Sequence, residues 1–174
     1  MEAHDSVAIV LYHVEKRCML MVRQFRPALY AAELRRAGFS SSAEAPTPPT
    51  LVSGFSCELC AGIVDKSMSL GEIAKEEVLE ECGYDVPVES IRKLTSFAAS
   101  VGVQGSTQTL FYAEVDESMK VQAAGGLAAD GERIELLGLP LEHVEAFIMD
   151  DAVPKTSGAM FGLLWAKNNL VAAE

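Results

Sequence analysis

The stretch that decides the fold is residues 69–83, which read Ser-Leu-Gly-Glu-Ile-Ala-Lys-Glu-Glu-Val-Leu-Glu-Glu-Cys-Gly. Ser69, followed three residues later by Glu72, forms the signature of a capping box, so a helix should begin directly after Ser69. Gly83 suits the left-handed position that follows the last turn of a helix. The pattern therefore predicts a helix over 70–82 that is bounded at both ends by its own sequence.

Two glutamates fall on the apolar face of this predicted helix. The apolar residues that recur at helical spacing are Leu70, Ile73, Ala74 and Val78. Glu77 and Glu81 lie in the middle of the same face, one turn apart, and Glu80 lies at its edge. Like charges at this spacing repel each other, and burial makes each ionised carboxylate costlier. Something must therefore offset the unfavourable free energy of placing the Glu77 and Glu81 carboxylates on this face.

Two physical solutions are open for this acidic pair. Either the pKa values of the carboxylates rise, or a cation lies between them. A solvated acidic face is the alternative, and it suits Glu72 and Glu76, which point away from the apolar stripe, better than it suits Glu77 and Glu81. Clustered carboxylates without histidine or cysteine ligands favour Mg²⁺, with Mn²⁺ as the alternative. We therefore expect a divalent cation on this helix.

Composition narrows the class of protein. The chain has 174 residues, typical of a single domain over 1–174, and 49% of them are apolar, enough for a core. Asp and Glu number 25 against 14 Lys and Arg, a net charge of −11, which disfavours nucleic-acid binding. The sequence has no run of 18 apolar residues and no signal-peptide pattern, so we expect no membrane span and a cytoplasmic location.

Strands and helices are expected to alternate along the chain, which predicts an α/β fold with a mixed sheet. The expected strands cover 7–12, 18–22, 55–63, 91–99, 107–115 and 133–137. Two further helices are expected over 141–149 and 158–172, the second with Trp165 in the core. The Ser-, Pro- and Ala-rich stretch 38–50 is expected to be a mobile loop within the domain.

The helix and the residues ahead of it resemble the Nudix box, G-x5-E-x7-R-E-U-x-E-E-x-G-U, in which U is bulky and apolar. Gly62 opens the pattern and 77–84 closes it, with the spacing of the family. Two positions depart, because Met68 replaces the first Glu of the box and Glu76 replaces the Arg that usually helps to hold its loop. Further stretches resemble the nucleoside-diphosphate-sugar branch of the Nudix hydrolases, which includes ADP-ribose pyrophosphatases: 22–27, 58–62, 108–112 and 154–156.

This resemblance implies a Nudix α/β/α sandwich with a mixed β-sheet, and hydrolysis of a diphosphate by water with the help of a divalent metal. Glu77 and Glu81 match the metal-binding glutamates of the family. Glu80 matches the supporting, catalytic one. The backbone carbonyl of Ala61, directly before Gly62, matches a further metal ligand.

The resemblance also implies residues that act on the substrate. Arg26 matches an arginine that contacts the diphosphate, and Arg23 is a second candidate. In the ADP-ribose enzymes the general base is an acid in a loop before a late strand; Asp130 is the first choice for that place and Glu132 the second. The segment 100–106 lacks an acid that the ADP-ribose enzymes carry, which favours a UDP-sugar.

The expected activity is Mg²⁺-dependent hydrolysis of a nucleoside diphosphate sugar, with UDP-glucose giving UMP and glucose 1-phosphate. ADP-ribose is the competing substrate. Met68 and Glu76 motivate a second class of function, a catalytically weak Nudix domain that binds a nucleotide or a partner. Members of this branch carry an N-terminal segment that swaps between subunits; this chain is expected to lack it, and a homodimer remains the expected assembly.

Overall fold

The computed structural model describes residues 4–39, 53–103, 105–126 and 133–170. Its strands are β1 (Ser6–His13), β2 (Cys18–Phe25), β3 (Phe55–Glu58), β4 (Cys60–Ile63), β5 (Arg92–Ala98), β6 (Thr107–Val115) and β7 (Ile134–Pro140). Its α-helices are α1 (Pro27–Arg36), α2 (Leu70–Glu77), α3 (Val144–Met149) and α4 (Ser157–Leu170). A π-helical turn, η2, covers Val78–Cys82, and short 3₁₀ turns cover Val88–Ser90, Glu117–Met119 and Leu141–His143.

The seven described strands form one mixed sheet. β1 pairs with β6 in parallel, whereas the other pairings are antiparallel. The hairpin of β1 and β2 is paired only over Leu11–His13 and Cys18–Leu20, beyond which the two strands separate. The chain over 55–63 fills this opening, because β3 pairs with β2 and β4 pairs with β1. The mixed sheet expected from the alternation of elements is confirmed.

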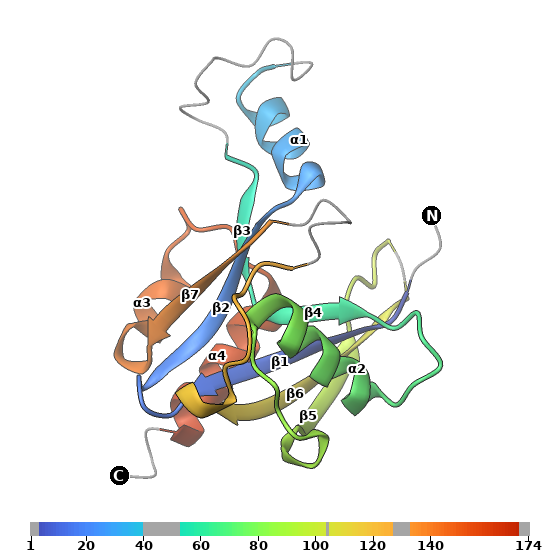
Figure 1. The fold of residues 1–174 in the computed structure, drawn as a ribbon. Helices are drawn as coiled ribbons and strands as arrows, with labels where there is room; N and C mark the ends of the chain where they lie inside the picture. The colour runs from blue at the N-terminus through green and yellow to red at the C-terminus, as the bar shows by residue number, and fades with distance from the viewer. Residues whose placement is uncertain (1–3, 40–52, 104, 127–132, 171–174) are drawn as a thin grey trace.

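Alternation along β1 divides the protein into two cores. Val7, Ile9 and Leu11 belong to a cluster on the α2 side of the sheet, together with Ile73 of that helix. The intervening Ala8 and Val10 belong to a second cluster, which includes Ala159 and Leu163 of α4 and Val144 of α3. A strand covered on both faces is apolar throughout, which explains the continuous apolar run of β1. The expected α/β/α sandwich is confirmed, with α2 on one face of the sheet and α4 on the other (Figure 1).

Two helices differ from what the sequence patterns predict. The patterns do not predict α1, although Pro27 occupies its first turn and Arg35 and Arg36 its last. α1 extends from the end of β2, away from the rest of the sheet (Figure 1). On α4, Trp165 is expected in the core, but it is only half-buried and packs against Tyr112 at the edge of the second cluster. Phe161 of the same helix is 47% exposed.

Small residues set the buried face of α4, because they let the helix approach the sheet closely. A Cβ atom at Gly162 would lie 2.8 Å from Cγ2 of Val10.

The expected loop over 38–50 begins with Gly38 and Phe39, which close the end of α1 through hydrogen bonds to Arg35 and Leu34. The remaining residues of this loop lie outside the described part of the chain. No helix among the described residues is long and apolar enough to cross a membrane.

Candidate active site

The helix that the sequence predicts over 70–82 is present, but it is not α-helical throughout. Ser69 and Glu72 form the full capping box, with the Ser69 side chain accepting from the backbone of Glu72 and the Glu72 side chain accepting from the backbone of Ser69. The α-helix ends at Glu77 and continues as the wider turn η2. Gly83 follows with φ +83°, the left-handed conformation expected of it. Hydrophobic periodicity over five residues is too short to distinguish a π-turn from an α-turn.

Glu77 and Glu81 both reach β4, at adjacent residues. The backbone N–H of Ala61 donates to Oε2 of Glu81 over 3.0 Å, and Glu81 is only 4% exposed. The Glu77 carboxylate lies over Gly62, where an added Cβ atom would come within 1.8 Å of Oε1. The structure therefore brings Glu77 and Glu81 together, as their spacing implies, and places both beside the backbone of Ala61 and Gly62.

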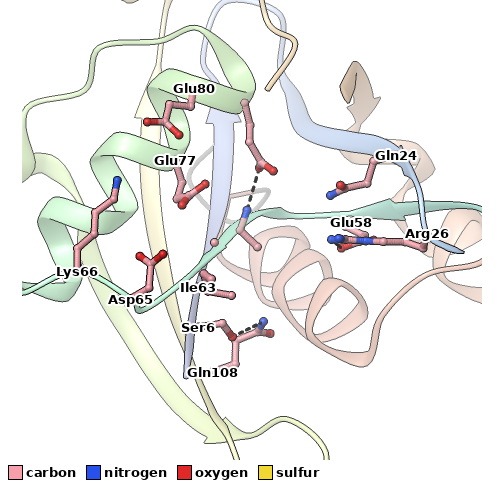
Figure 2. Close-up of a pocket in the computed structure, with 13 residues that line it drawn as sticks. Ser6, Gln24, Arg26, Glu58, Ile63, Asp65, Lys66, Glu77, Glu80 and Gln108 are labelled. Carbon is pink, nitrogen blue, oxygen red and sulfur yellow. Dashed lines mark hydrogen bonds and ion pairs between the residues drawn. The ribbon is translucent and has the colours of Figure 1, made fainter. Parts of the chain in front are cut away.

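A cavity of about 490 Å³ lies in front of these glutamates. Its lining is formed by Ser6, Gln24, Arg26, Glu58, Ala61, Gly62, Ile63, Asp65, Lys66, Glu77, Glu80, Glu81 and Gln108. Glu77 and Glu80 face the cavity from the helix, while Gln24, Arg26 and Glu58 lie across it at the end of β2 and β3 (Figure 2). Five of the lining residues are carboxylic acids and two are basic. An anionic ligand would therefore be repelled unless a cation accompanied it.

The residues of this cavity suit a magnesium-like ion better than a softer metal. Its candidate ligands, the carboxylates of Glu77 and Glu81 and the carbonyl of Ala61, all offer oxygen atoms, and the supporting Glu80 adds a further carboxylate. Among the described residues, no three His, Cys, Asp or Glu side chains stand close enough together to hold a metal ion by themselves. Mg²⁺ usually keeps several waters and takes one or two carboxylates together with phosphate oxygens of a substrate. The donor set fits that sparse mode of binding.

Arg26 forms a two-point ion pair with Glu58. Its Nε and Nη2 groups donate to the two carboxylate oxygens of Glu58, over 2.8 Å and 2.7 Å. The Ser56 hydroxyl donates to the same carboxylate over 2.5 Å. Burial favours a raised pKa for Glu58, but the hydrogen bonds from Arg26 and Ser56 outweigh it and lower this pKa below its ordinary value. Glu58 is therefore a buried, ionised carboxylate at the edge of the cavity.

Arg23, the second candidate for a substrate contact, lies elsewhere. It donates to Glu135 of β7 over 2.8 Å, and its guanidinium lies 4.3 Å from the centre of the Phe55 ring. Side chains alternate along β2, so Val22 and Gln24 face the α2 side and Arg23 faces the other. Arg23 is therefore absent from the described lining of the cavity, whereas Arg26, just beyond the strand, is part of it.

The two candidates for the general base, Asp130 and Glu132, lie outside the described residues. Several other residues of the cavity are not predicted by the sequence patterns, namely Ser6, Gln24, Glu58, Asp65, Lys66 and Gln108. A signal for Glu58 was available, because an acid directly before the apolar Leu59 and Cys60 interrupts an otherwise buried strand region. Ser6 and Gln108 gave no local signal, since β1 and β6 bring them together from positions 102 residues apart.

The two departures from the Nudix box have different surroundings. Glu76, which stands where the box has an arginine, forms an ion pair with Lys66 over 2.6 Å. Lys66 belongs to the loop between β4 and α2, so this ion pair joins the loop to the helix. Met68 lies in the same loop and is 38% exposed. A lysine in the loop and a glutamate on the helix therefore form a contact at the position where the box has an arginine.

A second, smaller cavity of about 160 Å³ adjoins the first. The two share Glu58, Ala61 and Gln108 as lining residues. The second cavity continues to the first turn of α4, where Gly158 lies against the Gln108 side chain. The pair of cavities therefore extends from the acidic helix to the opposite face of the sheet.

Comparison with known proteins gives relatives that include pyrophosphatases of nucleotide sugars. No model of a protein family matches this chain. The uridine diphosphate glucose pyrophosphatase NUDT14 of Bos taurus is 42% identical over an alignment that covers 95% of this chain and 78% of that protein. The mouse protein of the same name (Mus musculus) is 38% identical, covering 98% of this chain and 81% of its own length. A GDP-mannose pyrophosphatase of Citrobacter koseri is 33% identical, covering 83% of this chain and 64% of its own length.

These relatives come from the family that the box over 62–84 resembles. The relatedness extends over nearly the whole chain and is not confined to the acidic helix. This chain belongs to the nucleoside-diphosphate-sugar branch of the Nudix hydrolases.

Proposed function

We propose that this protein hydrolyses the diphosphate of a nucleoside diphosphate sugar, with UDP-glucose converted to UMP and glucose 1-phosphate. The observation that carries the proposal is the juxtaposition, in one cavity, of the acidic face of α2 and η2 with the Arg26 guanidinium. The names of the NUDT14 relatives support UDP-glucose as the first substrate to test, and those of the bacterial relatives add GDP-mannose. ADP-ribose remains the competing substrate.

The residues on the two sides of the cavity are proposed to have different roles, metal binding on one side and orientation of the phosphates on the other. Glu77, Glu81 and the carbonyl of Ala61 would hold a divalent cation, which we propose to be Mg²⁺ with Mn²⁺ as the alternative, and Glu80 would support them. When bound, such a cation neutralises charge on the diphosphate and acidifies water. Arg26 would orient phosphate oxygens, since a guanidinium fork has directional donors that a spherical ion lacks.

In the proposed reaction, the oxygen of a water molecule adds to one phosphorus atom, and the bond from that phosphorus to the bridging oxygen breaks. The bridging oxygen leaves with the other phosphate, and a base accepts the proton of the water. Asp130 is our first candidate for this base and Glu132 the second. The smaller cavity beside Gln108 offers room for one of the two groups that the diphosphate joins.

We propose further that the chain forms one Nudix domain over 1–174, acts in the cytoplasm as a homodimer, and binds neither nucleic acid nor membrane. The net charge of −11 supports the absence of nucleic-acid binding, because such a surface repels a phosphate backbone. Gel filtration with light scattering would test the dimer. A mass of a single 18.7 kDa chain would contradict it.

A substrate panel tests the activity. UDP-glucose, GDP-mannose and ADP-ribose are each incubated with the protein, with and without Mg²⁺, and the products are separated. Loss of an outer-shell partner of a metal already costs about 10–100-fold, so Glu81→Gln should lower kcat/KM by about 100-fold or more. Glu89→Gln, at an exposed glutamate outside the cavity, is the matched control.

Full activity of Glu81→Gln would refute the metal assignment. A wild-type protein that gains thermal stability with nucleotide sugars but cleaves none of them would support the binding module instead, and would refute hydrolysis.

A further inference from the structure

We propose that Glu58 is a positioning residue, which holds the Arg26 guanidinium in the orientation that a diphosphate requires. The inference rests on the proposed function, because it assigns a role within the same cavity. The inference goes beyond the proposed function, because it assigns a role to an acid that neither binds metal nor reacts in the proposed reaction.

Glu58 is the rigid partner of the pair. It is the last residue of β3, and its backbone lies opposite Val22 in the ladder with β2. It is 8% exposed, and its carboxylate also accepts the hydrogen bond from Ser56. A carboxylate with a buried stem, a fixed backbone and a second hydrogen bond has little freedom to move. Glu58 can therefore serve as a fixed anchor for a longer and more flexible side chain.

Arg26 is the more exposed partner, and the two-point contact with Glu58 orients its guanidinium. The Arg26 side chain is 46% exposed, against 11% for that of Glu58. Both carboxylate oxygens are engaged, by two different nitrogens of one planar group, so the pair fixes the plane of the guanidinium as well as its position. Glu58 and Arg26 lie together across the cavity from Glu77 and Glu80 (Figure 2). The anchor thus presents a cationic plane toward the acidic helix.

The position of the pair distinguishes this role from general stabilisation. Arg23 of β2 and Glu135 of β7 form a pair of the same residue types, with 2.8 Å between the guanidinium and the carboxylate. Their side chains are 40% and 60% exposed, and neither residue is among the described lining of the cavity. If Arg–Glu pairs served only to join strands, the two pairs should be equally dispensable for substrate binding. If Glu58 positions Arg26, only the pair in the cavity should matter.

A double-mutant cycle tests the inference. Wild type, Glu58→Gln, Arg26→Met and the double variant are compared for KM and kcat with the best substrate of the panel, and for affinity toward inorganic diphosphate by calorimetry. Gln retains the shape of Glu58 and its acceptor for Ser56, but it cannot form the charged two-point contact. Glu58→Gln should raise KM about tenfold and weaken diphosphate binding to a similar degree, with kcat changed less than about threefold.

The interaction between the two changes is the decisive readout. In the Arg26→Met background, Glu58→Gln should raise KM no further, because the residue that it positions is gone. The double variant should also melt at a higher temperature than Arg26→Met alone, since it no longer buries an unpaired carboxylate. Glu135→Gln is the control, and it should leave KM and kcat unchanged.

Three outcomes would overturn the inference. These are an unchanged KM in Glu58→Gln, an equal rise of KM in both backgrounds, or a loss of kcat alone, which would place Glu58 in the reaction itself. A wild-type protein that cleaves no substrate would instead refute the proposed function. The calorimetric cycle with inorganic diphosphate would still decide whether Glu58 acts through Arg26.

Discussion

Residue 62 illustrates how closely the candidate site is built against the backbone. The Glu77 carboxylate occupies the space in which any side chain at this position would begin, 1.8 Å from an added Cβ atom. The atoms in the way are the end of a flexible side chain, not backbone. A side chain at residue 62 would therefore displace the Glu77 carboxylate and leave β4 in place.

Gly62→Ala should therefore damage the site more than the fold. We expect kcat/KM at a limiting Mg²⁺ concentration to fall by about tenfold or more, because a carboxylate assigned to the metal is moved. The melting temperature should change by only a few degrees. Steady-state kinetics over a Mg²⁺ titration, with melting curves beside them, would measure both effects.

Gly71→Ala is the matched control for this change. Residue 71 lies on α2, and its added Cβ atom would make only an ordinary contact, 3.5 Å from Cγ2 of Val88. Alanine within a helix is favoured over glycine, so this variant should be as stable as wild type or more so, with full activity. Equal activity of the Gly62 and Gly71 variants would contradict the placement of Glu77.

At the scale of the element, the α2 and η2 segment carries three of the proposed functional glutamates and is closed at both ends. The capping box of Ser69 and Glu72 holds its beginning, and Gly83 ends it in a left-handed conformation. The last turn is a π-turn, a form that is frequent at functional sites. Glu80 and Glu81 both belong to that wider turn, so the caps hold the segment from which these acids project.

Removing the cap should therefore loosen the helix without reaching the cavity directly. Ser69→Ala is expected to lower the free energy of unfolding by about 1 kcal/mol, because the N–H of Glu72 loses its acceptor. Urea denaturation at neutral pH measures the change. Ser53→Ala removes a hydroxyl that accepts one long contact of 3.4 Å, and it should change stability by less than about 0.5 kcal/mol. Equal losses in the two variants would argue against the box.

At the scale of the whole molecule, the sheet separates two cores that have no buried residue in common over the described parts of the chain. One contains Ile73 of α2 and the other contains Leu163 of α4. Their exposed fractions are 2% and 0%. The two clusters pack against opposite faces of the same strands, so each helix can be perturbed with the sheet lying between it and the other.

Core substitutions on opposite faces should therefore add. Ile73→Val is expected to cost about 0.5–1.5 kcal/mol and Leu163→Ala about 2–5 kcal/mol. The double variant should lose the sum of the two values to within about 0.5 kcal/mol, because the two residues belong to separate clusters on opposite faces of the sheet. Chemical denaturation of the four proteins tests this. A coupling well above that margin would show that the sheet transmits strain between the cores.

The segments that sequence patterns could predict are those whose signals lie within a few residues. Helix α2 is predicted from its caps and apolar spacing, and the two glutamates on its face point to a metal before any tertiary contact is known. The α1 helix has local signals as well, in Pro27 and the run of helix-forming residues that follows it, although it is not among the expected elements. For η2, helical periodicity predicts that Glu81 lies on the inner face of the helix, but it does not predict that this turn is π-helical and not α-helical.

The sequence by itself determined that this protein has an acidic helix of the Nudix type beside a sheet covered on both faces. Only the tertiary structure decided that Arg26 faces the cavity and Arg23 does not, and that Glu58 anchors Arg26. The physical reason is the range of the interactions. Caps and helical periodicity connect residues at most a few positions apart, whereas strand pairing and a buried ion pair connect residues such as Arg26 and Glu58, which are 32 positions apart.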